Sequence, residues 1–170
     1  SPHRGVKCLA PLYQTFIKHF PQQEIEPIEG YMSGILEMLH AGKLDLGFAT
    51  TANSAFDDSL CFLPTQQEEI VLALPAFHRL ASYASQEAAQ AALVNLSEFQ
   101  DIPFVLMSSD STICQASQQL FSHSGFNPVI VYQSSNVIMF TEMVHSVPVP
   151  GLLPAYVAMS SKVFVHPRLT

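Results

Sequence analysis

The chain has 170 residues, of which 48% are apolar and 12% are charged. This excludes an intrinsically disordered chain and is enough apolar material for a packed core. The formal net charge of −7 would repel a phosphate backbone, so the chain by itself is expected to be a poor DNA or RNA binder.

The cysteine pattern and the chain start indicate a compartment. Cys8, Cys61 and Cys114 are far apart and form no CxxC pair. We therefore expect free thiols in a reducing compartment, with neither a zinc site nor a disulfide framework. The chain opens with SPHRG rather than a basic-then-apolar leader, and no apolar run approaches the roughly 18 residues of a membrane span. Together these features predict a cytoplasmic protein.

The first predicted element is a helix. Apolar residues over 5–19 recur at helical spacing. Pro11 within this pattern implies a bend, or a helix that starts near Ala10. Beyond it, Ile25 and Ile28 predict a partly exposed strand.

The most regular stretch is IEGYMSGILEMLHAGKLDLGF, residues 28–48. A helix is predicted from Ser33, whose hydroxyl would cap it, to His40. Gly42 stands where a left-handed helix stop is needed. A short buried strand is then expected over 44–48.

The remainder of the chain alternates predicted strands with helices, which indicates an α/β fold with largely parallel sheets. A strand pair is expected within 59–74, and the Ala- and Gln-rich segment 84–99 is left open as a helix or a polar surface loop. The later predicted elements are a buried strand at 102–107, a helix at 113–124 ended by Gly125, a strand at 128–133, a helix at 137–146, and two closing segments at 151–161 and 162–169.

Small hydroxylated residues follow predicted strands at 49–51, 108–112 and 134–136, each time before an expected helix. Ser1-Pro2-His3 precedes the first helix in the same way. In open α/β sheets, ligands lie at the carboxyl ends of strands, where helix N-termini offer N–H groups. Such hydroxyls serve as helix caps, as ligand contacts, or as both, and the sequence leaves these alternatives open.

Motifs for catalysis or metal binding are missing from the sequence. The seven histidines never stand three or four residues apart, and HExxH, GxSxG, GxGxxG and the phosphate-binding loop do not occur. Glu24, Glu26 and Glu29 are better explained as a solvated face than as a general acid or base. We therefore predict no catalytic residue, no metal and no cofactor.

A series of short motifs runs along nearly the whole chain in a characteristic order and spacing. The members are Leu9–Phe16 (LAPLYQTF), Phe20-Pro21, Glu29-Gly30, Leu36–Leu39 (LEML), Gly42–Gly47 (GKLDLG), Leu72–Ala81 (LALPAFHRLA), Ser124–Pro128 (SGFNP) and Leu152–Pro154 (LLP). This series resembles the effector-binding domain of LysR-type transcriptional regulators, with Arg79 where the family usually has proline.

The resemblance implies two Rossmann-like lobes joined by crossing strands, as in type 2 periplasmic binding proteins, with a ligand cleft between them. Lobe one would comprise 1–74 plus 161–170, and lobe two 75–160. Lobe one would be incomplete at both chain ends. The family's winged helix-turn-helix DNA-binding domain would be absent from this chain.

The resemblance also implies a function. A small metabolite would bind in the cleft and allosterically alter how a full-length homodimer or homotetramer holds DNA. The residues leave its class open: helix N-termini and hydroxyls suit a small carboxylate or polar metabolite, and Tyr31 and Ile113 suit an aromatic one. The implied effector-binding residues are His3, Arg4, Tyr31, Met32 and Thr50 from lobe one, and Ser109, Ser111, Thr112, Ser134 and Ser135 from lobe two. The implied dimer interface joins the helix near 5–19 to that near 113–124 of another subunit, through Leu9, Leu12, Phe16, Ile113 and Leu120.

One stretch departs from the family pattern. The family's glycine-rich GxGxxLLP is represented here by Val147-Pro148-Val149-Pro150-Gly151, in which two glycines are replaced. Two other classes stay open, a transport solute-binding protein and an enzyme on a similar fold. The missing leader and the free cysteines count against the first, and the missing catalytic groups count against the second.

Overall fold

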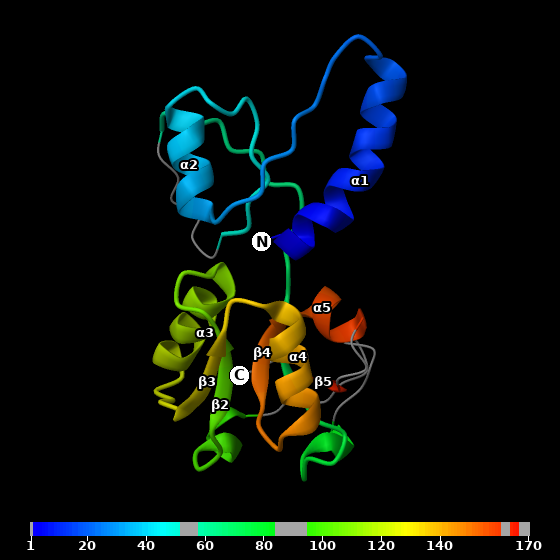
Figure 1. Ribbon diagram of the computed structural model, residues 1–170. Helices are drawn as coiled ribbons and strands as arrows, with labels where there is room; N and C mark the ends of the chain where they lie inside the picture. Colours follow the sequence, from blue (N-terminus) through cyan, green and yellow to red (C-terminus); the bar gives the residue numbers. More distant parts are fainter. Residues whose placement is uncertain (1, 52–57, 84–94, 161–163, 167–170) are drawn as a thin grey trace. The chain divides into compact units, whose positions relative to one another are not determined.

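The computed structural model describes residues 2–51, 58–83, 95–160 and 164–166 (Figure 1). The chain forms two compact units, residues 1–62 and 63–170. Each unit is described by itself below. None of the helices in the described residues is long and apolar enough to cross a membrane.

The first unit begins with helix α1 (Pro2–His19). Pro11 lies inside this helix, so the predicted start near Ala10 is wrong. Pro2 suits the first turn because its fixed φ matches the helix and its missing N–H would have no partner there. Pro2 and His3 are therefore helical residues, so the prediction that they precede the first helix is wrong, and Arg4 is helical as well.

Helix α2 (Met32–His40) follows, with Tyr31 as its N-cap residue. Ser33 is within the helix, so the predicted hydroxyl cap at Ser33 is wrong, and Tyr31 makes no side-chain cap hydrogen bond. The helix stop is confirmed, because Gly42 has a φ of 66° in the left-handed region, which glycine adopts without steric cost.

The two strands predicted in the first unit do not form. Residues 25–28 and 44–48 belong to no strand of the described structure. Leu46 is 70% exposed, which contradicts a buried strand. A strand is defined by backbone hydrogen bonds to a neighbour, and the described part of this unit contains no such ladder.

The second unit contains one open sheet of five strands (Figure 1). The strands are β1 (Ile70–Leu74), β2 (Phe104–Met107), β3 (Ile130–Ser134), β4 (Gly151–Pro154) and β5 (Phe164–His166), in the order β3-β2-β4-β1-β5. β2 is parallel to both β3 and β4, whereas β1 is antiparallel to β4 and β5. The sheet is thus mixed, which corrects the prediction of largely parallel sheets.

The helical segments of this unit are the short 3-10 helices η1 (Ala81–Tyr83) and η3 (Leu96–Phe99), and the α-helices α3 (Thr112–His123), α4 (Val137–Ser146) and α5 (Ala155–Ser160). Gly125, with a φ of 63°, ends α3 as predicted. The first member of the strand pair expected within 59–74 does not form, because residues 61–69 carry no strand. The Ala- and Gln-rich prediction falls mostly on 84–94, outside the described residues.

Alternation along the strands divides the core between the two faces of the sheet. Phe104 and Leu106 pack with Phe121 of α3 on one face. Val105 and Met107 pack with α4 on the other. This follows from the two-residue period of a strand, which sends successive side chains to opposite faces. β1 and β5 belong to the same sheet, and the division into lobes at residues 74 and 161 stays a prediction.

Candidate functional site

Two of the hydroxylated segments meet at one edge of the sheet. β2 and β3 are parallel, with Met107 paired to Ser134, so their carboxyl ends lie side by side. The Ser108 N–H donates to the Ser134 carbonyl oxygen at 2.9 Å and joins the segments directly. We call residues 108–112 and 134–136 together the strand-end edge.

Ser111 caps helix α3 at this edge. Its Oγ accepts a hydrogen bond from the Cys114 N–H at 3.1 Å, and its backbone N–H donates to the Ser108 carbonyl at 2.9 Å. The capping alternative is thus confirmed for Ser111. Contact of Ser111 with a ligand stays a prediction.

Helix α4 is capped by Asn136, which was not among the predicted site residues. Its Oδ1 accepts from the N–H groups of Ile138 at 2.9 Å and Met139 at 3.3 Å. The buried Ser134 hydroxyl donates to the Asn136 carbonyl and accepts from the Asn136 N–H, both at 3.1 Å. Ser134 is therefore engaged in the turn, while Ser135 is exposed. An asparagine directly before an apolar helical run was the signal for the cap.

Ser108 is a second residue that the sequence-based prediction of the site omitted. Its Oγ is buried and has no hydrogen-bond partner. Leaving a buried hydroxyl unsatisfied costs about 1–3 kcal/mol. Its backbone N–H and carbonyl, in contrast, are both bonded within the edge. At Ser108 the strand-end edge therefore has a buried hydroxyl without a hydrogen-bond partner.

Exposed apolar side chains lie next to these polar groups. Ile138, in the first turn of α4, is 67% exposed, and Met139 beside it is exposed as well. Ser109 is exposed and Thr112 is half-buried. The edge thus offers hydroxyl and amide groups beside apolar surface, which is the mixture typical of small-molecule sites.

Positive charge is scarce around this edge. In the described part of the second unit, Arg79 is the one Lys or Arg, and its guanidinium donates to the Glu98 carbonyl at 3.0 Å. Asp110 adds a carboxylate to the edge. An anion bound here would depend on hydroxyls and on N–H groups at the helix N-termini, which carry a partial positive charge.

Cys114, in the first turn of α3, is the thiol nearest the edge in sequence. It is fully buried, and burial raises the pKa of its thiol, with a further contribution from the Asp110 carboxylate. A raised pKa keeps the thiol protonated, and the thiolate is the reactive form. The described residues also contain no group of three His, Cys, Asp or Glu that would hold a metal.

The predicted effector-binding residues of the first unit lie in three places, α1, the start of α2, and Thr50, which belongs to neither helix. His3 and Arg4 are in α1, and Tyr31 and Met32 are at the start of α2. Tyr31 is exposed, whereas Met32 and Thr50 are half-buried. Their participation in one site with the strand-end edge stays a prediction.

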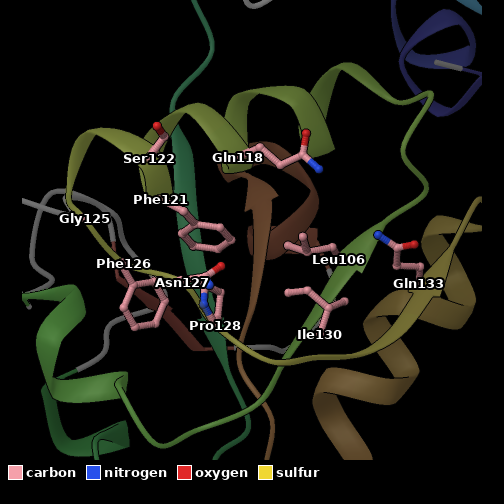
Figure 2. Close-up of a pocket in the computed structure, with 10 residues that line it drawn as sticks. All are labelled: Leu106, Gln118, Phe121, Ser122, Gly125, Phe126, Asn127, Pro128, Ile130 and Gln133. Carbon is pink, nitrogen blue, oxygen red and sulfur yellow. The ribbon is translucent and has the colours of Figure 1, made fainter.

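A groove of about 460 Å³ lies between α3 and the edge strand β3 (Figure 2). Its lining includes Leu106, Phe121 and Ile130, with the amide of Gln133 at one end and Phe126 at the other. Val129, just before β3, and Val131, within it, are both exposed. We call this surface the α3–β3 groove.

The residues predicted for a dimer interface have unequal exposure. Leu12 on α1 is 48% exposed, while Leu9 and Phe16 are half-buried. Ile113 and Leu120 on α3 pack against the core of their own unit. The α3 side chains that line the groove are instead Gln118, Phe121 and Ser122.

Similar structures are known for LysR-type regulators. The effector binding domain of QuiR in complex with shikimate has 21% identity and a TM-score of 0.74, over 94% of this chain and 73% of that one. The BenM effector binding domain with its effector benzoate has 18% identity and a TM-score of 0.72, over 96% of this chain and 72% of that one. Full-length CbnR complexed with target DNA has 17% identity and a TM-score of 0.65, over 88% of this chain and 49% of that one. These likenesses show the fold.

The sequence also matches a family model, although it matches none of the curated proteins. That model describes the LysR substrate binding domain and extends over residues 1–162. The resemblance carried by the ordered motifs is thereby confirmed. The chain belongs to the LysR substrate-binding domain family, the effector-binding part of LysR-type transcriptional regulators.

Proposed function

We propose that this chain binds a small-molecule effector and that binding allosterically controls transcription by the full-length protein. The observation that carries the proposal is the strand-end edge, where the Ser108–Ser134 hydrogen bond brings two capped helix N-termini together. Ligands of open α/β sheets bind at such edges. The raised pKa of Cys114 and its burial favour a sensor over a thiol enzyme.

The effector in this proposal is a small carboxylate, with an aromatic or other ring as its apolar part. Helix N-termini and hydroxyls suit the carboxylate, and the exposed Ile138 and Met139 suit a ring. QuiR and BenM, whose folds are similar, bind shikimate and benzoate. The proposed contacts are His3, Arg4, Tyr31, Met32, Thr50, Ser109, Ser111, Thr112, Ser134 and Ser135.

Thermal-shift measurements with small carboxylates, shikimate and benzoate among them, test this proposal. A ligand at about 100 times its Kd should stabilise the protein by about 2.7 kcal/mol. For the ligand that does so, Ser109→Ala and Thr112→Ala should each weaken binding about tenfold, since each removes a hydrogen bond to a charged group.

The control for these variants is Ser146→Ala, at the exposed far end of α4. It should leave the affinity unchanged. Ser111→Ala is less informative, because loss of the α3 cap would itself cost about 1 kcal/mol. Equal affinity in wild type, Ser109→Ala and Thr112→Ala would place the effector elsewhere.

Regulation of DNA binding implies further partners. We propose a cytoplasmic homodimer or homotetramer that contacts DNA through a separate domain, as full-length CbnR was captured with its target DNA. In this proposal the exposed apolar side chains of α1 contribute to the contact between subunits. A transport solute-binding protein is not favoured, because the matching family model is that of LysR regulators.

Leu12→Glu tests the subunit contact. Leu12 is 48% exposed on α1, so a charge there should leave the fold of its own unit intact while opposing burial between subunits. Light scattering should show the molar mass falling to that of the monomer. Gln14→Glu, which adds the same charge at an exposed position of α1, should keep the parent mass. An unchanged mass for Leu12→Glu would exclude this face of α1 from the interface.

A further inference from the structure

The connection from α4 to β4 consists of Val147-Pro148-Val149-Pro150, which we call the Val-Pro connection. In the LysR family pattern this stretch contains glycines, and glycine is the residue with the greatest backbone conformational freedom. Proline fixes φ near −65°, and valine is branched at Cβ and restricted at χ1. The composition of the connection therefore opposes bending.

Hydrogen bonds hold the Val-Pro connection along its length. The Val147 N–H donates to the Met143 carbonyl of α4 at 3.0 Å, and the Pro150 carbonyl accepts from the Val105 N–H of β2, also at 3.0 Å. Between them, the Val149 N–H donates to the Val147 carbonyl at 2.7 Å. This last bond closes a three-residue turn centred on Pro148, a turn whose central φ suits proline.

Packing holds the same segment from the side. Val149 is only 4% exposed and belongs to the cluster that contains Phe140 and Val144 of α4 and Leu153 of β4. Where β4 begins, a Cβ built on Gly151 would lie 2.4 Å from Phe140 Cζ. The ring of α4 thus rests directly on the backbone of β4.

We propose that the Val-Pro connection joins α4 and β4 into one rigid piece. The N-terminus of α4 lies at the strand-end edge and its far end continues through the connection into β4. A displacement of the α4 N-terminus is then transmitted to β4 and is not absorbed by the turn. β4 pairs with both β2 and β1, so it links that helix to the centre of the sheet. The regulatory role of this coupling rests on the proposed function, whereas its mechanical part does not.

Native-state hydrogen exchange of the intact protein tests the coupling without any ligand. In the wild type, the amides of Val144 and Val147 should open with the same free energy as those of Leu152 and Leu153, as one cooperative unit. In Pro148→Gly, exchange at Val144 and Val147 should become about tenfold faster relative to Leu152 and Leu153, because a proline-to-glycine change restores backbone freedom. Pro148 is exposed, so the substitution removes little packing.

Pro128→Gly makes the same change on the connection between α3 and β3, at a half-buried position, and serves as the control; it should leave the α4 and β4 amides coupled. Urea unfolding of both variants measures the change in global stability. This change is subtracted from the change in the opening free energy of each amide. Different opening free energies for α4 and β4 in the wild type, or equal ones in Pro148→Gly, would overturn the proposal. Because no effector is added, this outcome is independent of whether the carboxylates bind.

Discussion

Gly151→Ala should lower the free energy of unfolding by about 1–3 kcal/mol, because it forces a methyl group into a filled space. The added Cβ would lie 2.4 Å from Phe140 Cζ and 3.1 Å from Val105 Cγ2. Both neighbours belong to the core, so relief requires α4 or β2 to shift. Urea denaturation of the intact protein, followed by circular dichroism, measures the change.

Gly34→Ala is the control for this substitution. Gly34 lies within α2, and a Cβ there would meet nothing within 4 Å. Alanine favours a helix over glycine, so a gain of about 0.5–1 kcal/mol is expected. If Gly151→Ala were as stable as the parent, the close approach of Phe140 to β4 would be wrong.

Phe104→Ala should cost about 3–5 kcal/mol, the range for removing a buried phenylalanine. Phe104 is fully buried on β2, where its ring makes edge contacts with Phe99, Phe121 and Phe126 at centroid distances of 6.0, 5.6 and 5.5 Å. The deletion therefore removes the ring that joins η3, α3 and the turn after α3. Thermal and urea unfolding measure the loss.

Phe77→Ala separates this packing effect from the general loss of a phenylalanine. Phe77 is 62% exposed, and a surface substitution of this kind is usually within about 0.5 kcal/mol of neutral. Similar losses for the two variants would contradict a core centred on Phe104.

Local signals were sufficient for most elements of the second unit. The apolar runs at 70–74 and 102–107 contain strands β1 and β2, and Gly125 ends α3, as the sequence predicted. These features depend on near neighbours in sequence, such as the φ of a helix stop or the period of a buried run. Apolar patterns at 25–28 and 44–48 predicted strands that do not form. A strand also needs a partner strand, which a local pattern does not specify.

The candidate site shows the same division. Hydroxylated residues after a strand were visible in the sequence, and Ser111 does cap α3. The sequence did not show that the Ser134 hydroxyl is engaged by Asn136, nor that the Ser108 hydroxyl is buried without a partner. Satisfaction of a polar group depends on what lies around it in space, which neighbouring residues in the sequence do not specify.

The sequence by itself determined the family, through the order of its motifs, and most helix and strand positions of the second unit, through period and capping. Only the tertiary structure decided that β1 runs antiparallel to β4 and that residues 108–112 and 134–136 share one edge. It also decided that Ile113 and Leu120 pack on their own core. The physical reason is that a two-residue alternation is identical for either strand direction, so direction and pairing are set by contacts between segments distant in the chain.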